Sequence, residues 1–168
     1  MTAKRQGITA EFLRNVLTYD KNTGVLRWKK KISRKIKVGE IAGSKAGAHW
    51  QVGMYGENYL AHHLIWVMMT GDWPTDEVDH EDTDGQNNKW KNLRIATRKQ
   101  NSANRGKNSN NTSGIKGVSW CKDRQKWQVG IKVNYRRIAL GRYDSKEEAG
   151  EVYRKAAEKF FGEFSRSD

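Results

Sequence analysis

Apolar and polar positions change their spacing several times along the first half of the chain. Residues 9–19 place their apolar side chains on one side of a short predicted helix. A strand is predicted for residues 49–54, followed by a turn at 55–58, where glycine and asparagine occur together. Residues 60–70 are apolar almost throughout, which predicts a second, buried helix that ends at Gly71.

The second half of the chain contains a clear strand pattern. In KWQVGIKV, residues 126–133, apolar and polar side chains alternate, which is typical of a strand with one buried face. Neighbouring strands are predicted for residues 115–120 and 136–143. Together these segments indicate a three-stranded antiparallel sheet.

Two capping boxes predict the starts of two further helices. Thr97 with Gln100 precedes a short basic helix, and Ser145 with Glu148 precedes a longer amphipathic one. Gly162 is a natural end for the longer helix. We expect the longer helix to cover one face of the three-stranded sheet and to leave the polar face free.

A polar stretch separates the two halves. Residues 106–113, GKNSNNTS, hold no side chain that could bury a substantial apolar area, so they are predicted to be a linker. This boundary divides the chain into an N-terminal region, 1–105, and a C-terminal domain, 114–168. The expected fold class is α+β.

Composition narrows the choice of partners. The 168 residues carry a formal net charge of +13, which favours a polyanionic partner and fits DNA, a ribosome or a membrane surface.

The longest strongly apolar run, 64–69, is much shorter than the roughly 20 residues of a membrane-spanning helix. The first residues lack the apolar segment of a signal peptide. The single cysteine excludes an internal disulfide and a zinc site with several cysteines. A cytoplasmic protein with no membrane association is therefore expected.

Basic residues are concentrated around the predicted sheet. Between Arg98 and Arg142 there are twelve Lys or Arg residues and one acid, Asp123. A solvated surface usually mixes both signs, so this imbalance favours nucleic-acid binding. The residues expected to line the free face, as candidate nucleic-acid contacts, are Lys122, Arg124, Lys126, Lys132, Arg136 and Arg137.

The segment VDHEDTDGQNNKW, residues 78–90, is acidic within this basic chain. It could neutralise a neighbouring basic patch, bind calcium or hold a catalytic metal, but it lacks the ligand spacing and the final Glu of an EF-hand loop. Hydrolysis of a phosphodiester needs a base and a divalent cation, and histidine is the side chain best suited to accept a proton near neutral pH. His80 offers such a base and Asp79 offers an oxygen ligand for such a cation, although adjacent strand residues point to opposite faces.

The wider pattern over residues 62–104, with HHLIWVMMTG, VDHED, NLR and QN in order, resembles HNH endonucleases of the phage and intron-encoded homing type. The resemblance implies a ββα fold around one metal ion, Mg²⁺ or Mn²⁺, in each active site. It implies that His80 is the general base, that Asp79 and Asn101 are metal ligands, and that Asn92 braces the loop and orients His80. Asn104 shares the helix face of Asn101 and is either a supporting or DNA-contacting residue, or a capping or solvated one.

Residues 114–162 resemble an AP2 DNA-binding domain, through GIKGVSW, KWQVGI and ALGRYDSKEEA. That resemblance implies a sheet lying in the major groove and adds Gln128 to the candidate DNA contacts. The basic helix after Thr97 adds Arg98, Lys99 and Arg105, and Asn104 is included with them.

These observations predict a metal-dependent, site-specific DNA endonuclease of the homing or free-standing phage type. One base and one metal ion act on one phosphodiester, so each site is expected to nick one strand of double-stranded DNA. We expect a monomer without an obligate protein partner, acting in the cytoplasm of the host cell. The alternatives are a non-cleaving DNA-binding regulator that uses an HNH scaffold, and an RNA- or ribosome-associated protein.

Overall fold

The computed structural model describes residues 7–108 and 110–166. The chain forms two compact units, residues 1–96 and 97–168, and each is described by itself. Within the described residues, small antiparallel sheets combine with four α-helices, so the fold is of the α+β class.

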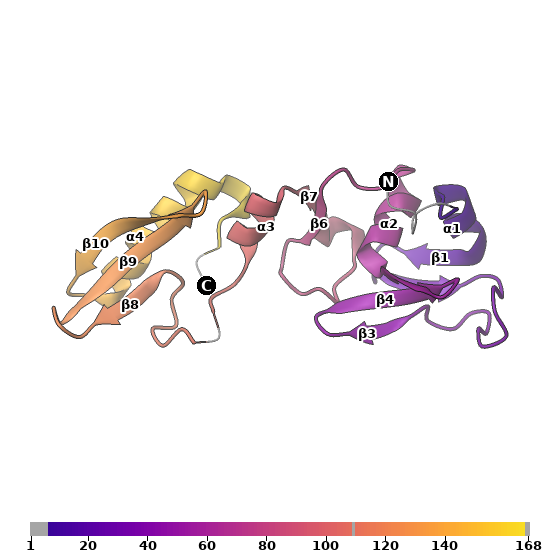
Figure 1. Ribbon diagram of the computed structural model, residues 1–168, viewed down its shortest axis with the longest axis horizontal. Coiled ribbons are helices and arrows are strands. Elements are labelled where there is room, and N and C mark those ends of the chain that lie inside the picture. The colour runs from indigo at the N-terminus through magenta and orange to yellow at the C-terminus, as the bar shows by residue number, and fades with distance from the viewer. Residues whose placement is uncertain (1–6, 109, 167–168) are drawn as a thin grey trace. The chain divides into compact units, whose positions relative to one another are not determined.

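The described residues of the first unit form three small antiparallel sheets, with strand orders β1-β2, β3-β4-β5 and β6-β7. Strands β1, β3, β4, β6 and β7 are labelled in Figure 1. Its elements in chain order are α1 (Ala10–Val16), β1 (Leu17–Asp20), β2 (Val25–Trp28), β3 (Ser44–Ala46), β4 (His49–Met54), β5 (Glu57–Leu60), α2 (Ala61–Thr70), β6 (Glu77–His80), the 3₁₀ helix η2 (Trp90–Asn92) and β7 (Leu93–Ala96).

Two predicted boundaries in this unit were wrong. The helix predicted for residues 9–19 ends at Val16, because Leu17 adopts an extended conformation and pairs with Trp28 in the β1–β2 hairpin. The apolar positions of this segment suit either a helix or a strand, and the pairing decides between them. The turn predicted for residues 55–58 is also shorter, because strand β5 already begins at Glu57.

Helices α1 and α2 pack together and form the centre of the core of the first unit. Leu13 of α1 and Leu64 and Ile65 of α2 are fully buried. Helix α2 ends at Gly71 as predicted, in the left-handed conformation (φ 98°) that glycine adopts without strain. This packing fixes the position of the first turn of α2, which carries His62.

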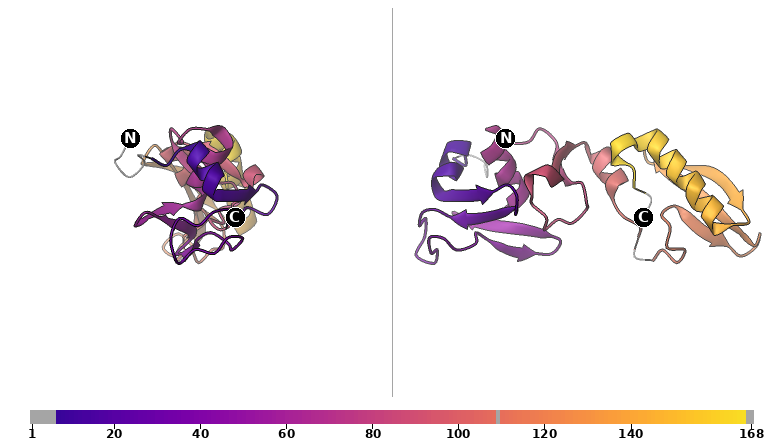
Figure 2. Two further views of the ribbon diagram at one scale, coloured as in Figure 1. Left: turned by 90° about the vertical axis from the view of Figure 1, so that its right-hand side faces the viewer. Right: turned by 180° about the vertical axis from the view of Figure 1, so that it is seen from behind.

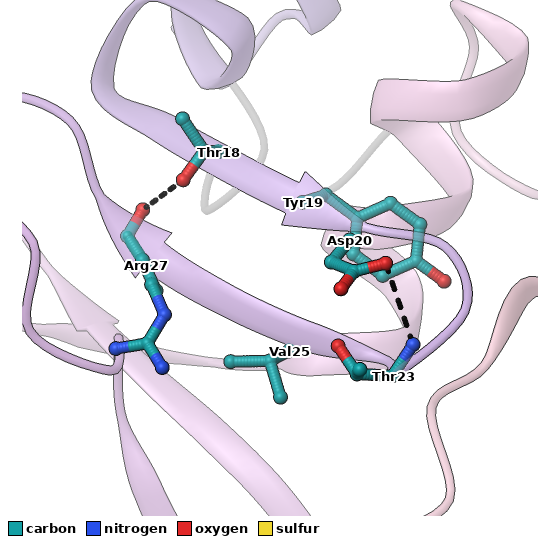
Figure 3. A pocket seen from close by; sticks show the side chains of 6 residues that line it. All are labelled: Thr18, Tyr19, Asp20, Thr23, Val25 and Arg27. Carbon is teal, nitrogen blue, oxygen red and sulfur yellow. Dashed lines mark hydrogen bonds between the residues drawn. The ribbon is translucent and has the colours of Figure 1, made fainter.

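A pocket of about 290 Å³ lies on the β1–β2 hairpin, and Figure 3 shows the six side chains that line it. Its polar groups bond within the hairpin. The carboxylate of Asp20 accepts hydrogen bonds from the backbone N–H groups of Asn22 and Thr23, and the hydroxyl of Thr18 donates to the carbonyl of Arg27. The hydrogen bonds from Asn22 and Thr23 lower the pKa of Asp20, the bond from the Asn22 backbone most of all. The arrangement stabilises the turn of this hairpin.

The second unit is a three-stranded antiparallel sheet of order β10-β9-β8 with helix α4 packed on one face (Figure 2). Its elements are α3 (Arg98–Asn104), β8 (Val118–Cys121), β9 (Lys126–Val133), β10 (Arg136–Tyr143), α4 (Lys146–Phe161) and the 3₁₀ helix η3 (Gly162–Phe164). Val129 and Ile131 of β9 meet Ala149, Tyr153 and Ala157 of α4 in its core.

The structure places α3 and the predicted linker differently from the sequence-based boundary. Helix α3 packs against η3 and belongs to the second unit. Ser113, at the end of the predicted linker, is buried, and its hydroxyl donates to the carbonyl of Val118 at 2.7 Å. The side chain of Asn111 bonds the backbone of Gly114 and Ile115. Side-chain hydrogen bonds thus order a stretch that has little apolar area to bury.

Within residues 7–108 and 110–166, every helix is too short or too polar to cross a lipid bilayer.

Candidate functional site

The β6–β7 ribbon positions the two residues that the sequence singled out first. Strand β6 pairs antiparallel with β7 so that Asp79 lies opposite Arg94 and His80 lies opposite Leu93. Directly opposed residues share a face, and neighbours along a strand lie on opposite faces. Asp79 and His80 therefore project from different faces of the ribbon, as their adjacency in the sequence predicts.

Asp79 is 5% exposed and forms an ion pair with Arg94. Nε of Arg94 donates to Oδ2 of Asp79 at 3.2 Å, and both side chains are largely removed from water. A buried carboxylate costs several kcal/mol unless it is paired and hydrogen-bonded, so Arg94 explains how Asp79 is tolerated as an anion at this position.

His80 is 4% exposed and bonds to the loop that follows β6. Its Nε2 lies 3.0 Å from Oδ1 of Asn88, which is also buried. Burial lowers the pKa of His80 most strongly, and the bond to Asn88 opposes that shift. The ring is therefore neutral at physiological pH, which is the form that can accept a proton.

Asn92 ties the loop between β6 and β7 into a closed turn. Its Oδ1 accepts from the backbone N–H of Asp82 at 3.1 Å, and its Nδ2 donates to Oδ1 of Asp82 at 2.9 Å and to the carbonyl of Asn87 at 2.7 Å. Desolvation raises the pKa of Asp82, but the bonds from Asn87 and Asn92 outweigh it and the net shift is downward. Asn92 thus braces the loop, and Asn88 provides the hydrogen bond that reaches His80.

Two histidines from distant parts of the sequence lie beside His80. His49 is the first residue of β4, and His62 is in the first turn of α2. The ring centroids of His62 and His80 are 4.8 Å apart, and those of His49 and His80 are 5.8 Å apart. Burial lowers the pKa of His62 to about 2, with further contributions from His63, His80 and His49. The sequence provided no role for His49, since only folding brings β4 beside β6.

A lysine-rich pocket occurs elsewhere on the first unit. It has a volume of about 260 Å³ and is lined by Lys21, Asn22, Lys89, Trp90 and Lys91. The backbone N–H of Trp90 donates to the carbonyl of Lys21, which joins the β1–β2 turn to η2. Lysine ammonium groups are point charges suited to phosphate, so this pocket is a candidate contact for the phosphate backbone of DNA. The sequence alone did not indicate it.

The polar face of the second unit carries several of the predicted DNA contacts. Lys126, Gln128 and Lys132 alternate with the core positions of β9. Arg137 pairs with Lys132 in the register, and a side chain at Gly130 would collide with the Arg137 guanidinium, so Arg137 lies across this face. Lys126 also forms an ion pair with Asp144 at 3.0 Å. Lys122 and Arg124 are exposed in the turn between β8 and β9.

The register differs from the prediction for one residue of this set. Arg136 pairs with Val133, whose side chain packs into the core under α4, so Arg136 projects toward the covered face rather than the polar one. Arg142 pairs with Gln128 and joins the polar face in its place. A bulge between Ala139 and Gly141 shifts the register along β10, which strand alternation alone does not predict.

Helix α3 carries the remaining predicted site residues. Arg98, Lys99 and Arg105 are exposed, Asn101 is half-buried, and Asn104 is 4% exposed. Lys116 donates to the carbonyls of Ala103 and Arg105 at 2.6 Å each and so holds the end of the helix. A pocket of about 650 Å³ in this unit is lined in part by Lys99, Arg105 and Lys132. The role of Asn101 as a metal ligand stays a prediction.

The side chains present can supply two kinds of metal donor. Asp79 offers carboxylate oxygen and Asn101 amide oxygen, which are the donors that Mg²⁺ and Mn²⁺ prefer. His49, His62 and His80 offer imidazole nitrogen atoms that all lie within 4.8 Å of one another. Divalent metal chemistry is therefore compatible with Asp79 and the three histidines, all of which belong to the first unit.

Comparison with known proteins identifies an HNH endonuclease region in this chain. The HNH endonuclease family profile matches residues 59–103, which run from β5 through α2 and the β6–β7 ribbon into α3. Protein 3.8 of Escherichia phage T7 is 33% identical over 106 residues, which cover 62% of this chain and 87% of that protein. An uncharacterized HNH endonuclease of Acanthamoeba polyphaga mimivirus is 31% identical over 111 residues, which cover 66% of this chain and 57% of that protein.

The HNH endonuclease profile thus indicates a nuclease domain that acts on DNA. The chain belongs to the HNH endonuclease family. No solved structure matches it.

Proposed function

We propose that this protein is a metal-dependent DNA endonuclease in which His80 activates the attacking water. The observation that supports this most directly is the bond between His80 Nε2 and Asn88 Oδ1 on a ribbon inside the matched HNH region. An amide oxygen only accepts, so this bond requires the proton of neutral His80 to sit on Nε2. Nδ1 then carries the lone pair that accepts a proton from water.

The chemical step follows from that assignment. His80 Nδ1 removes a proton from water as the water oxygen bonds to phosphorus, and the bond from phosphorus to one ester oxygen breaks. A divalent cation supplies electrostatic stabilisation of the phosphate and of the departing oxygen. Asp79 is the proposed ligand in the first unit, and Asn101, inside the matched region 59–103, is the proposed ligand on α3. Arg94 holds the Asp79 carboxylate in place.

The second unit is proposed to bind double-stranded DNA through its polar, basic face, in an AP2-like manner. Lys132 and Arg137 lie next to each other there and are exposed, and helix α4 covers the opposite face. Positive side chains neutralise phosphates, and Gln128 offers both a donor and an acceptor for base edges. The similarity to Protein 3.8 of phage T7 supports a phage-type enzyme, and we propose that it is either homing or free-standing.

One base acts on one phosphodiester, so a monomer is proposed to nick a single strand at each binding event. Supercoiled plasmid tests this directly, because a nick produces an open circle and a double-strand break produces a linear molecule. We expect open circles to form first with Mg²⁺ or Mn²⁺ and to be absent with EDTA. A protein that binds the plasmid but cuts it with neither cation would instead be the non-cleaving regulator.

A further inference from the structure

Three histidines meet in the first unit although the sequence separates them widely. His49 begins β4, His62 lies in the first turn of α2, and His80 ends β6. One ligand atom from each ring lies within 4.8 Å of the others. His62 and His80 are buried, and His49 is half-buried.

The donor chemistry of this cluster differs from that of the proposed catalytic cation. Mg²⁺ selects oxygen ligands, whereas imidazole nitrogen suits zinc and its neighbours among the transition metals. Three protein nitrogen atoms with one position left open form a common tetrahedral arrangement for Zn²⁺. Zn–N bonds of about 2.0–2.1 Å place the nitrogen atoms roughly 3.4 Å apart, so small rotations of the rings from the present spacing would complete the site.

Two features of the rings favour a ligand at this position. Nδ1 of His49 and Nδ1 of His62 are buried and have no hydrogen-bond partner within residues 7–108 and 110–166. An unsatisfied buried nitrogen costs about 1–3 kcal/mol, which a coordinated cation can offset when a ring turns its nitrogen toward the centre. Gly85 packs so closely on His49 and the Ala48 carbonyl that a methyl group at position 85 would collide with both. This close packing holds the His49 ring in the cluster.

We propose that His49, His62 and His80 bind a divalent transition-metal ion of the Zn²⁺ type, and that this ion inhibits DNA cleavage. The binding site stands on the geometry of the three rings. The inhibition rests on the proposed function, because the nitrogen that coordinates the cation belongs to the side chain that must accept the proton. An ion of this type and the catalytic Mg²⁺ thus have opposite effects on the enzyme.

Binding is tested without reference to activity, on the full chain without a histidine tag. Co²⁺ is added as a coloured substitute for Zn²⁺, and the visible absorption of a tetrahedral complex is followed to saturation. We expect one Co²⁺ per chain, displaced by one Zn²⁺, in the natural protein. His49→Gln and His62→Gln should each weaken Co²⁺ binding by at least about 100-fold, since losing a ligand costs more than losing an outer-shell partner. His63→Gln is the matched control, because His63 neighbours His62 but lies outside the cluster, and it should bind like the natural protein.

Circular dichroism of each variant establishes that it is folded. If the buried His62→Gln variant does not fold, the half-buried His49→Gln variant decides the question. Equal Co²⁺ affinity of the natural protein and His49→Gln would overturn the site.

Inhibition is tested by plasmid nicking in Mg²⁺ with increasing Zn²⁺, and each variant is compared with its own rate without Zn²⁺. We expect the natural protein and His63→Gln to be inhibited at the same Zn²⁺ concentration and His49→Gln to need at least about tenfold more, since it lacks one ligand. Unchanged nicking at saturating Zn²⁺, or equal inhibition of His49→Gln, would overturn the inhibitory role. Absence of nicking by the natural protein in Mg²⁺ and Mn²⁺ would instead reject the proposed function, and the Co²⁺ titration would still decide the binding site.

Discussion

His80 Nε2 and Asn88 Oδ1 lie 3.0 Å apart and join the end of strand β6 to the loop that leads toward β7. Both residues are buried, so the bond forms away from competing water. It sets the tautomer of a neutral histidine within an HNH endonuclease domain. The loop therefore fixes the position of the His80 proton as well as the path of the chain.

Replacing His80 with Ala should reduce nicking of supercoiled plasmid in Mg²⁺ by about 100- to 10,000-fold, the usual contribution of a general base. DNA binding, measured by fluorescence anisotropy at fixed salt, should change little because His80 is buried and carries no charge at neutral pH. His63→Ala is the control for loss of a nearby imidazole. Undiminished nicking by a folded His80→Ala variant would disprove the assignment of the base.

Asn88 is predicted to act as a positioning residue through His80. Asn88→Ala removes the acceptor and should lower the single-turnover rate of cleavage by about 10- to 100-fold, as for other groups that orient a functional histidine. Asn88→Asp retains an oxygen acceptor at the same place and should restore most of the rate. A purely structural role would lower the unfolding free energy of both variants and would not separate their rates.

The buried His62 should make the protein sensitive to acid. Its pKa falls from 6.5 to about 2 on folding, so below pH 6.5 the unfolded chain binds a proton that the folded chain does not. Unfolding then becomes easier as the pH falls, by about 1.4 kcal/mol for each pH unit below 6.5 from this residue alone. Urea unfolding at a series of pH values measures the slope. A His62→Phe variant that shows the same slope as the natural protein would contradict this origin.

Asn92 should stabilise the first unit. Asn92→Ala removes three hydrogen bonds and leaves the carbonyl and carboxylate partners in the loop less satisfied, at a cost of about 1–3 kcal/mol in the free energy of unfolding. Asn87→Ala removes one side-chain bond to Asp82, which is exposed, and should cost less. Urea unfolding of the two variants measures both free energies of unfolding. Equal destabilisation would contradict a larger contribution of Asn92 to stability.

The polar face of the second unit should determine the salt dependence of DNA binding. Lys132→Ala combined with Arg137→Ala should weaken binding and lower the slope of log K against log salt by about 0.9 for each phosphate that is no longer neutralised. Arg136→Ala is the matched control on the same strand as Arg137, because its register places it toward the covered face. If Arg136→Ala weakened binding as much as either of the other substitutions alone, the assignment of the DNA-binding face would be wrong.

Local patterns in the sequence predict much of this fold. The alternation in residues 126–133 corresponds to strand β9, and the capping box at Thr97 has both of its hydrogen bonds. The left-handed end of α2 occurs at Gly71. These predictions are correct because each feature is determined within a few residues, by side-chain periodicity, a local hydrogen bond or a permitted backbone angle. The end of α1 was missed because strand pairing with Trp28, a residue outside the segment, determines it.

The sequence by itself determined the acidic, histidine-containing stretch, the order of polar residues that marks an HNH domain, and the basic charge of the second half. Only the tertiary structure decided which side chains meet. Asn88 rather than Asn92 bonds to His80, Arg136 and Arg142 lie on opposite faces, and His49 joins His62 and His80. The physical reason is that a loop closure, a β-bulge and the packing of β4, α2 and β6 depend on long-range interactions. No spacing along the chain encodes such interactions locally.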